Sequence, residues 1–508
     1  MINHQLIKNI SGIIFLAGAT GNFNLHGQKV NNPNIVLILA DDLGYGDVSS
    51  YNANSRIKTS NIDSVASRGL IFKDAHSNSS VSTPTRYGIL TGRYCWRTSL
   101  KEGVLDGYSD PLIPEDRLTI ASMLRLSGYN TAYIGKWHMG LKWARKSSNR
   151  EDVDYTLPFS HGPLSLGFDY FFGISGSLDM PPYVYLENNK IVGIPDNITE
   201  NNSTAQLWRK GTVSKDFRHR ECLPIMVQKS ISYLNEKASD NKSFFLYLAL
   251  PAPHTPILPL SEFKGKSGIG EYGDYVLEVD HFIGDIVKCL KENKLFDNTI
   301  FIITSDNGCS PAAGTNELEK LGHFPSAQFR GYKADLYEGG HREPLIVSWP
   351  KKIKREFIGN QLISLTDLMA TFAELTGFKL SDNQAEDSFS FFPLLLNPSS
   401  AFMGREAMVQ HSYYGNFAIR KGDWKLLLTP YSGGWSFPQQ GIDDGKIKSL
   451  PKFQLYNLKN DPGERNNLYN NHRSKAKQLK KLMIRYIKYG RSTPGKIQKN
   501  DGQINYEF

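Results

Sequence analysis

The chain has 508 residues, of which 40% are hydrophobic, and it carries a formal net charge of +9 at pH 7. This length suffices for one large domain and a smaller one, and no apolar run is long enough to span a membrane. Four cysteines in so long a chain exclude a disulfide-rich fold and leave two alternatives open, one disulfide or free buried thiols. The positive charge suits an anionic substrate, and because no nucleic-acid-binding motif accompanies it, we expect no nucleic-acid partner.

The first residues have the pattern of a secretory signal peptide. Residues 1–27 contain Lys8, a short apolar run at 10–19 and small residues after that run. An N-terminal strand is the alternative interpretation of the apolar run. No cysteine follows it, so we expect no lipoprotein anchor.

Apolar runs and helical patterns then alternate along the chain. We expect strands at 34–40, 131–134, 244–250, 299–304 and 345–349, and helices at 114–126, 275–292 and 366–375. This alternation predicts an α/β fold with a large, mostly parallel or mixed central sheet flanked by helices. Polar residues follow several of these strands, and open α/β sheets bind their ligands at the carboxyl ends of strands.

The pattern changes after about residue 385. We expect a hairpin at 418–428, a strand at 453–458, a turn at 460–463 and a basic amphipathic helix at 473–488, whose charges form a solvated face. The chain is thus predicted to have a main domain at 30–385 and a C-terminal α+β subdomain with an antiparallel sheet at 386–508.

The segment 82–93 carries the most informative motif. Ser82 comes just before Pro84, and proline is well tolerated at the first position of a helix. Ser82 is therefore placed at a helix N-terminus, where backbone N–H groups and the dipole favour an anion. The guanidiniums of Arg86 and Arg93 add bidentate oxyanion recognition. The segment predicts a nucleophile directed at a tetrahedral anion such as sulfate or phosphate.

Two pairs of oxygen-bearing residues follow predicted strands. Asp41 and Asp42 end the first strand, and Asp306 and Asn307 follow the fourth. Such pairs are common in turns, so either pair alone is weak evidence. Together they offer hard ligands that suit Ca²⁺ or Mg²⁺ better than zinc.

These motifs resemble the signatures of the sulfatase family. Residues 82–93 match a Ser or Cys followed by x-Pro-x-Arg and Leu-Thr-Gly-Arg, with Thr85 where many members have Ser. Residues 128–140 match a second signature, Gly-Tyr-x-Thr-Ala followed by Gly-Lys-Trp-His-x-Gly. The resemblance implies an alkaline phosphatase-like fold and sulfate-ester hydrolysis.

The resemblance also implies two cofactors. A maturation enzyme would oxidise Ser82 to formylglycine (3-oxoalanine), whose hydrate is the nucleophile in this family. One Ca²⁺ ion, with Mg²⁺ less expected, would be bound by Asp41, Asp42, Asp306, Asn307 and the oxidised Ser82.

The same resemblance implies catalytic or structural roles for further residues. Arg86, Lys136 and Lys333 would stabilise the sulfate oxygens, His138 would contact a hydroxyl of the hydrate, and His254 would protonate the leaving oxygen. Glu338 and Arg342 would hold the loop that follows Lys333.

The expected substrate is a sulfated carbohydrate, with a 6-O-sulfated galactose or N-acetylgalactosamine as the narrower expectation. Candidate substrate contacts are Ser177, His161, Asp179 and His341, with aromatic and polar side chains at 179–185 and Trp435. The signal peptide, the serine-type signature and the lack of a disulfide framework predict a secreted protein of the bacterial periplasm.

Two alternatives stay open at this point. A phosphate-ester hydrolase of the same superfamily would use a plain serine with two zinc ions, which need more His and Asp ligands than we can place. A non-catalytic protein that binds sulfated glycans would need no oxidation of Ser82.

Overall fold

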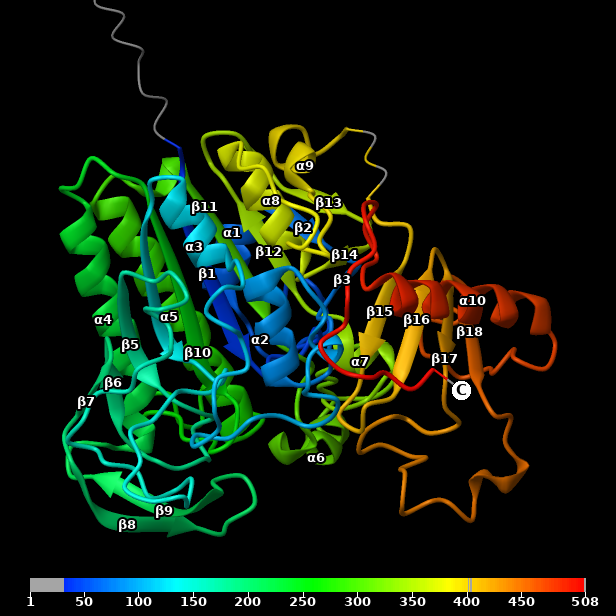
Figure 1. Cartoon of the computed structure of the whole chain (residues 1–508), viewed down its shortest axis with the longest axis horizontal. Helices are drawn as coiled ribbons and strands as arrows, with labels where there is room; N and C mark the ends of the chain where they lie inside the picture. The colour runs from blue at the N-terminus through cyan, green and yellow to red at the C-terminus, as the bar shows by residue number, and fades with distance from the viewer. Residues whose placement is uncertain (1–31, 401, 403, 507–508) are drawn as a thin grey trace, which may run out of the picture. The chain divides into compact units, whose positions relative to one another are not determined.

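The computed structural model describes residues 32–400, 402 and 404–506, so the predicted signal peptide lies outside the described residues. Ten strands form one mixed sheet: β1 (Asn34–Asp41), β2 (Gly69–Phe72), β4 (Asn130–Lys136), β5 (Tyr170–Ile174), β6 (Tyr185–Glu187), β7 (Lys190–Val192), β10 (Phe244–Pro253), β11 (Thr299–Ser305), β12 (Leu345–Ser348) and β13 (Phe357–Gly359). Their order is β13-β2-β12-β11-β1-β10-β4-β5-β6-β7 (Figure 1).

The middle of this sheet is parallel. β1 pairs in parallel with β10 and β11, and β4 continues the parallel run to β5. β12 is antiparallel to both β11 and β2, so the sheet is mixed. The predicted α/β class with a mostly parallel or mixed sheet is confirmed.

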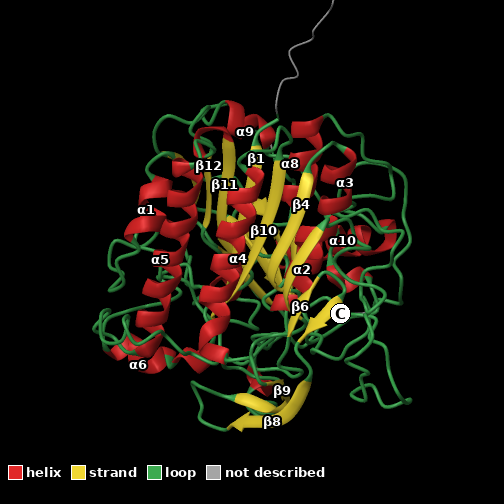
Figure 2. Ribbon diagram, turned by 90° about the vertical axis from the view of Figure 1, so that its left-hand side faces the viewer, coloured by secondary structure: helices red, strands yellow, loops and turns green. Residues whose placement is uncertain are grey.

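Both faces of the sheet are covered by helices (Figure 2). Every residue of β1 is buried, with Leu37 in one apolar cluster and Val36 in another, as alternation along a strand requires. The cluster of Leu37 includes residues of α2 (Ser82–Thr91), α3 (Ile120–Leu126), α8 (Asp367–Thr376) and α9 (Phe392–Leu396). The cluster of Val36 includes residues of α1 (Ser60–Ala66), α4 (Cys222–Lys237) and α5 (Glu271–Glu292).

A second, antiparallel sheet follows in the C-terminal part, in the order β15 (Met408–His411), β16 (Phe417–Lys421), β17 (Trp424–Leu427) and β18 (Gln454–Asn457). The helix α10 (Arg473–Tyr489) packs on it through one apolar cluster. Gly422 turns the predicted hairpin with a positive φ of 57°, which glycine adopts without strain.

The remaining elements are short. They are the parallel pair β3 (Ala75–His76) and β14 (Ile363–Ser364), the hairpin β8 (Pro195–Asn201) and β9 (Trp208–Ser214), the helices α6 (Thr315–Lys320) and α7 (Glu338–His341), and 3-10 turns at Cys95–Arg97, His219–Glu221, Phe296–Asn298, Pro311–Ala313 and Ile447–Ser449. All four cysteines are free and buried. No helix in the described part of the chain is long and apolar enough to cross a bilayer.

The predicted helix starts differ from the structure in detail, and the start predicted at residue 114 was wrong. The helix predicted from residue 114 begins at Ile120, because Thr119 and Ser122 form a capping box there. Thr366 is the N-cap residue of α8, as predicted, but its hydroxyl makes no capping bond and donates to the backbone carbonyl of Asp387. α2 begins at Ser82 itself, and Pro84 occupies the third helical position, where a missing N–H still costs no intrahelical bond.

Candidate active site

Four strands of the mixed sheet deliver polar side chains to one edge. β1 and β4 end in Asp41 and Lys136, while His254 follows β10 and Asp306 follows β11. Since these strands are parallel neighbours, their carboxyl ends meet at the same edge. The first turn of α2 places Ser82 at this edge as well. The sequence prediction of one shared site at the strand ends therefore agrees with the topology.

The hydroxyl of Ser82 lies between an anion and a cation. It donates to Asp41 Oδ1 at 3.3 Å, and Lys136 Nζ donates to it at 3.2 Å. Lys136 also bonds Asp41 Oδ2 at 2.6 Å and Ser177 Oγ at 3.0 Å. Burial alone would raise the pKa of Asp41, but Lys136, His254 and Arg86 hold that pKa well below its ordinary value. Asp41 is therefore a stable carboxylate.

The guanidinium of Arg86 points toward two carboxylates, and Arg86 is not among the residues that line the cleft over Ser82. Its guanidinium bonds Asp306 Oδ2 at 2.8 Å, lies 3.7 Å from Asp41, and donates to the backbone carbonyl of Lys136 at 3.0 Å. The side chain is fully buried. This geometry gives Arg86 the task of fixing two carboxylates in place.

Asp42 is held by residues from two distant segments. Lys333 Nζ lies 2.7 Å from Asp42 Oδ1, and Asn307 Nδ2 donates to the same oxygen at 2.6 Å. Burial would lower the pKa of Lys333, but Asp42, Asp41 and Asp306 raise it, so the ammonium stays protonated.

The donor set fits a hard divalent cation. Asp41, Asp42 and Asp306 bring carboxylate oxygens to one buried region, and the carbonyl oxygen Oδ1 of Asn307 is buried with no hydrogen-bond partner. A buried acceptor without a donor is costly unless something positive faces it. Asp41, Asp42 and His254 each place a candidate ligand atom within 4.8 Å of the others. Oxygen-rich sets of this kind suit Ca²⁺ or Mg²⁺.

Two histidines face the same region with different surroundings. His138, whose φ is 59°, contacts the backbone carbonyl of Leu105 through Nε2 at 2.6 Å, and its Nδ1 has no partner. Burial, together with Lys136, lowers the pKa of His138 well below its ordinary value, so the ring is neutral. His254 is partly exposed and lies 3.4 Å from Ser177 Oγ and 3.7 Å from Asp42.

A cleft of about 450 Å³ opens over Ser82. Its lining includes Val81, Ser82, Val104, His138, Ser177, Asp179, Met180, Asn202, Thr204, Leu207, Arg209, His254, Thr255, Ser310, Ala312, Lys333, Tyr413 and Trp435. Asp179 Oδ2 accepts a hydrogen bond from Arg209 at 2.7 Å. The cleft thus joins predicted residues from the main domain with Trp435 from the C-terminal part.

Two predicted substrate contacts lie outside this lining. His161 contacts the backbone carbonyl of Ile113 and the carboxylate of Glu115, so both ring nitrogens are engaged elsewhere. His341 is fully buried on α7, and its Nδ1 lies 3.4 Å from the carbonyl of Ser77. Neither ring lines the cleft.

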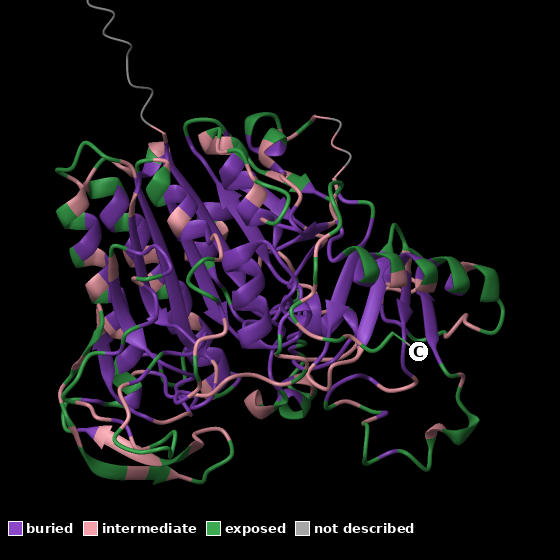
Figure 3. Ribbon diagram, viewed as in Figure 1, coloured by how far each residue is buried: buried purple, intermediate pink, exposed green. Residues whose placement is uncertain are grey.

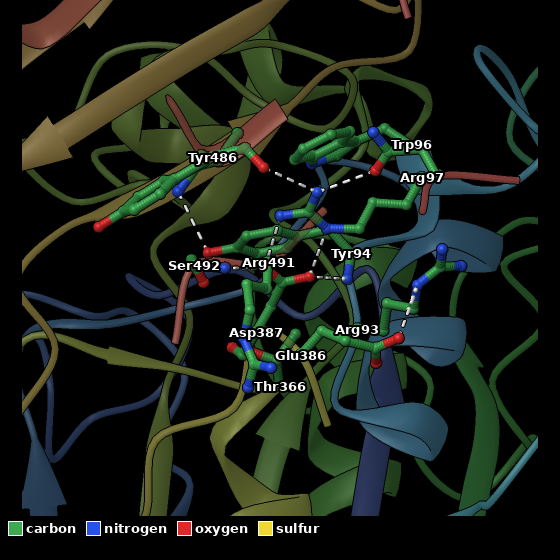
Figure 4. A network of polar contacts seen from close by, with 12 residues as sticks. Arg93, Tyr94, Trp96, Arg97, Thr366, Glu386, Asp387, Tyr486, Arg491 and Ser492 are labelled. Atoms are coloured by element: carbon green, nitrogen blue, oxygen red, sulfur yellow. Dashed lines mark hydrogen bonds and ion pairs between the residues drawn. The ribbon is translucent and has the colours of Figure 1, made fainter. Parts of the chain in front are cut away.

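The expectation that Arg93 adds to oxyanion recognition was wrong. Its guanidinium bonds Asp501 at 2.8 and 3.1 Å and Tyr87 at 3.2 Å. It also lies 3.3 Å from Glu386 (Figure 4). Arg93 thus binds the end of the chain and does not reach the cleft.

Glu338 holds the segment that follows Lys333, as the sequence led us to expect. It lies 3.0 Å from Lys425 of β17 and 2.9 Å from both His76 and Arg342. The C-terminal sheet thereby supports the loop that carries Lys333.

Sequence reasoning missed Arg209 and Tyr413 in the cleft. Arg209 lies on the exposed hairpin β8–β9, which has neither an apolar run nor a recognisable motif. Tyr413 follows β15 and reaches the cleft only through the packing of the two sheets. No signal in the sequence marks either residue.

The fold and the site together define an ester hydrolase with an alkaline phosphatase-like architecture. The sequence model of the sulfatase family matches residues 33–378, which is more than half of the chain. A Bacteroides thetaiotaomicron protein named N-acetylgalactosamine-6-O-sulfatase is 34% identical, over 94% of this chain and 98% of its own length. The chain belongs to the sulfatase family and is a sulfatase.

Other relatives agree with this assignment. The human N-acetylgalactosamine-6-sulfatase is 29% identical over 85% of this chain and 81% of its own. A solved structure from work on glycosaminoglycan metabolism by Bacteroides thetaiotaomicron superposes with a TM-score of 0.78 at 32% identity, over 90% of this chain and 99% of that one. A sulfatase from a Pseudoalteromonas species shares the fold, with a TM-score of 0.68 at 24% identity over 90% of each chain.

Proposed function

We propose that this sulfatase hydrolyses 6-O-sulfate esters of N-acetylgalactosamine or galactose in sulfated glycans, with formylglycine made from Ser82 as nucleophile. The contact of Ser82 with both Lys136 and Asp41, at the base of a cleft of about 450 Å³, carries this proposal. The names of the bacterial and human relatives support the N-acetylgalactosamine 6-sulfate part.

Asp41, Asp42, Asp306, Asn307 and the hydrate of oxidised Ser82 would hold Ca²⁺. When bound, the ion would supply positive charge that lowers the pKa of the attacking hydroxyl. The unpartnered Oδ1 of Asn307 supports this assignment.

The side chains around Ser82 would each have a separate role in the reaction. One hydroxyl oxygen of the hydrate, having lost its proton to water, forms a bond to sulfur while the bond between sulfur and the sugar oxygen breaks. Lys136 and Lys333 stabilise charge on the sulfate oxygens, and His254 donates a proton to the departing sugar oxygen. Because His138 is neutral and its Nδ1 is free, it accepts the proton of the second hydroxyl. The carbonyl re-forms as the C–O bond breaks and sulfate leaves.

Asp179 and Arg209 form the wall of the cleft where the sugar would lie. A carboxylate and a guanidinium held 2.7 Å apart can bind neighbouring hydroxyls of one ring, and the face of Trp435 suits stacking with the ring. We further propose that the protein is exported by its N-terminal segment and that a maturation enzyme oxidises Ser82.

Mass spectrometry and a substrate pair test the function. Co-expression with a formylglycine-generating enzyme should remove about two hydrogens from the peptide that contains Ser82. The matured protein should hydrolyse N-acetylgalactosamine 6-sulfate and leave the 6-phosphate intact, whereas Ser82→Ala should be inactive on both. Preferred cleavage of the phosphate ester would instead assign a phosphohydrolase, and binding without turnover would assign a glycan-binding protein.

A further inference from the structure

The helix α10 carries a charge of one sign that the hydrolysis of a sulfate ester does not use. It contains seven Lys and Arg residues and no Asp or Glu, so it accounts for most of the net charge of +9. Leu479, Met483 and Tyr486 pack it on the antiparallel sheet. Its outer side is exposed to solvent (Figure 3).

The spacing of these cations is unfavourable for the helix itself. Arg473, Lys477, Lys481 and Arg485 are four residues apart, so they lie one above another on the helix surface. Like charges at this spacing destabilise a helix by about 0.2–0.5 kcal/mol per pair. Arg473 also lies in the first turn, at the positive end of the helix dipole. Apolar packing on the sheet holds α10 in place, so the helix does not depend on this row of cations. Their accumulation on one helix indicates a ligand that supplies negative charge.

A groove of about 930 Å³ runs beside α10 at the tip of the β16–β17 hairpin. Its charged lining residues are Lys421, Lys475, Lys481, Arg485, Lys488, Glu406 and Asp423. Glu406 is already paired with two of these cations, Lys421 and Arg485. No carboxylate of the described residues forms an ion pair with Lys475, Lys481 or Lys488, so the groove keeps a positive charge.

The groove also has an apolar floor. Trp424 is partly exposed and Tyr489 is 48% exposed, and both line the groove beside Leu479 and Leu482. An aromatic face stacks on the C–H face of a pyranose ring, while surrounding ammonium groups bind sulfate oxygens. A concave groove accommodates a linear chain, whereas a membrane surface requires a convex contact.

We propose that this cationic groove is a second, non-catalytic binding site for a sulfated polysaccharide chain. The choice of polymer rests on the proposed function, because a glycan that carries the ester cleaved at Ser82 carries further sulfate groups. A chain bound in the groove raises the effective concentration of its other sulfate esters near the cleft. Positive patches of this kind also accelerate the association of polyanions.

The test compares two variants of equal charge change in the Ser82→Ala background, which cannot cleave the probe. The groove variant carries Lys475→Gln, Lys481→Gln and Lys488→Gln. The control carries Lys288→Gln, Lys291→Gln and Lys294→Gln, three exposed lysines in the last turns of α5 and just after it. Glutamine preserves helix propensity, so both variants should fold, which circular dichroism checks.

The probe is chondroitin 6-sulfate, and binding is measured by calorimetry between 50 and 200 mM salt. We expect the groove variant to bind the probe at least about tenfold more weakly at low salt. The slope of log K against log salt should decrease in magnitude by about two, because fewer counterions are released on binding. The control should bind like the parent. Trp424→Ala should weaken binding without changing the slope. Unchanged binding by the groove variant would overturn the proposal.

Further measurements distinguish a failure of this proposal from a failure of the proposed function. In protein that retains Ser82, the three lysine substitutions of the groove variant should raise KM for the polymer. They should leave the hydrolysis of N-acetylgalactosamine 6-sulfate unchanged. If the matured protein cleaves no sulfate ester but the groove still binds the polymer, the proposed reaction fails and the groove stands. Equal or tighter binding of duplex DNA or of phosphatidylserine vesicles would overturn the assigned ligand class.

Discussion

The ammonium of Lys333 lies 2.7 Å from the carboxylate of Asp42, although 291 residues separate them in the chain. Lys333 reaches this position because its backbone N–H bonds the carbonyl of Cys309 and because Glu338 is anchored to Lys425. One wall of the catalytic cleft is thus maintained from the C-terminal sheet.

Replacement of Lys333 by Met should remove a cation from the sulfate oxygens while preserving the length of the side chain. We expect kcat/KM to fall about 10²–10³-fold, the usual effect of losing one oxyanion-stabilising group. Lys320→Met on exposed α6 is the matched control and should retain full activity. Steady-state kinetics with N-acetylgalactosamine 6-sulfate measure both, and near-normal kcat/KM for Lys333→Met would remove Lys333 from the reaction.

Asn307→Leu should weaken cation binding, since it deletes the only site donor that is a neutral amide oxygen. For the wild type, Ca²⁺ at 100 times its Kd should raise the free energy of unfolding by about 2.7 kcal/mol. The variant should need at least about tenfold more Ca²⁺ for the same rise. Thermal unfolding with EDTA and with added Ca²⁺ measures this, and an EDTA-insensitive wild type would contradict the assigned metal site.

Arg86 lies on α2 and Arg93 follows the end of that helix, and the two arginines should separate stability from catalysis. Arg93→Ala leaves Glu386 buried without this partner and should lower the free energy of unfolding by about 2–4 kcal/mol while kcat/KM changes little. Arg86→Ala should abolish activity, because Asp41 and Asp306 lose their shared cation. Urea denaturation and kinetics on both variants test this; a large loss of kcat/KM in fully folded Arg93→Ala would contradict it.

The stability of the fold should decrease in acid. Burial lowers the pKa of His411 to about 4, whereas an unfolded histidine titrates near 6.5. Between these values the unfolded chain binds more protons, so the free energy of unfolding falls by up to about 1.4 kcal/mol per pH unit for this residue. Between pH 7 and pH 4, the free energy of unfolding of His411→Phe should therefore fall by about 3 kcal/mol less than that of the wild type. Urea titrations across that range measure the difference, and identical pH slopes would refute the assignment.

The elements that the sequence predicted well are those buried on both sides. β1, β10 and β11 are continuous apolar runs because helices cover both faces of the sheet, and their polar ends marked Asp41, His254 and Asp306. Three of the four strands of the small sheet were also predicted, since the turn at Gly422 separates two alternating segments, but β15 was not.

The residues that were misjudged depend on partners far away in the chain. Arg93 stands in a catalytic signature, but its carboxylate partner Asp501 is 408 residues distant and carries no motif. Arg209 enters the cleft from a polar hairpin whose exposed strands have little apolar patterning. Local pattern cannot report contacts that only tertiary packing creates.

Residues 492–501 bind the segment that follows α2, so this part of the fold can form only late in synthesis. Asn500 bonds Arg97 and Asp501 bonds Arg93. The backbone N–H of Ser492 donates to Asp387, which also binds Arg97 (Figure 4). These contacts form only after the residues up to 501 have been synthesised. In the folded chain Ser82 is 2% exposed and lies at the base of a cleft, so another protein has little access to its side chain. The oxidation that we propose for Ser82 would therefore come before folding is complete, and slower folding would leave more time for it.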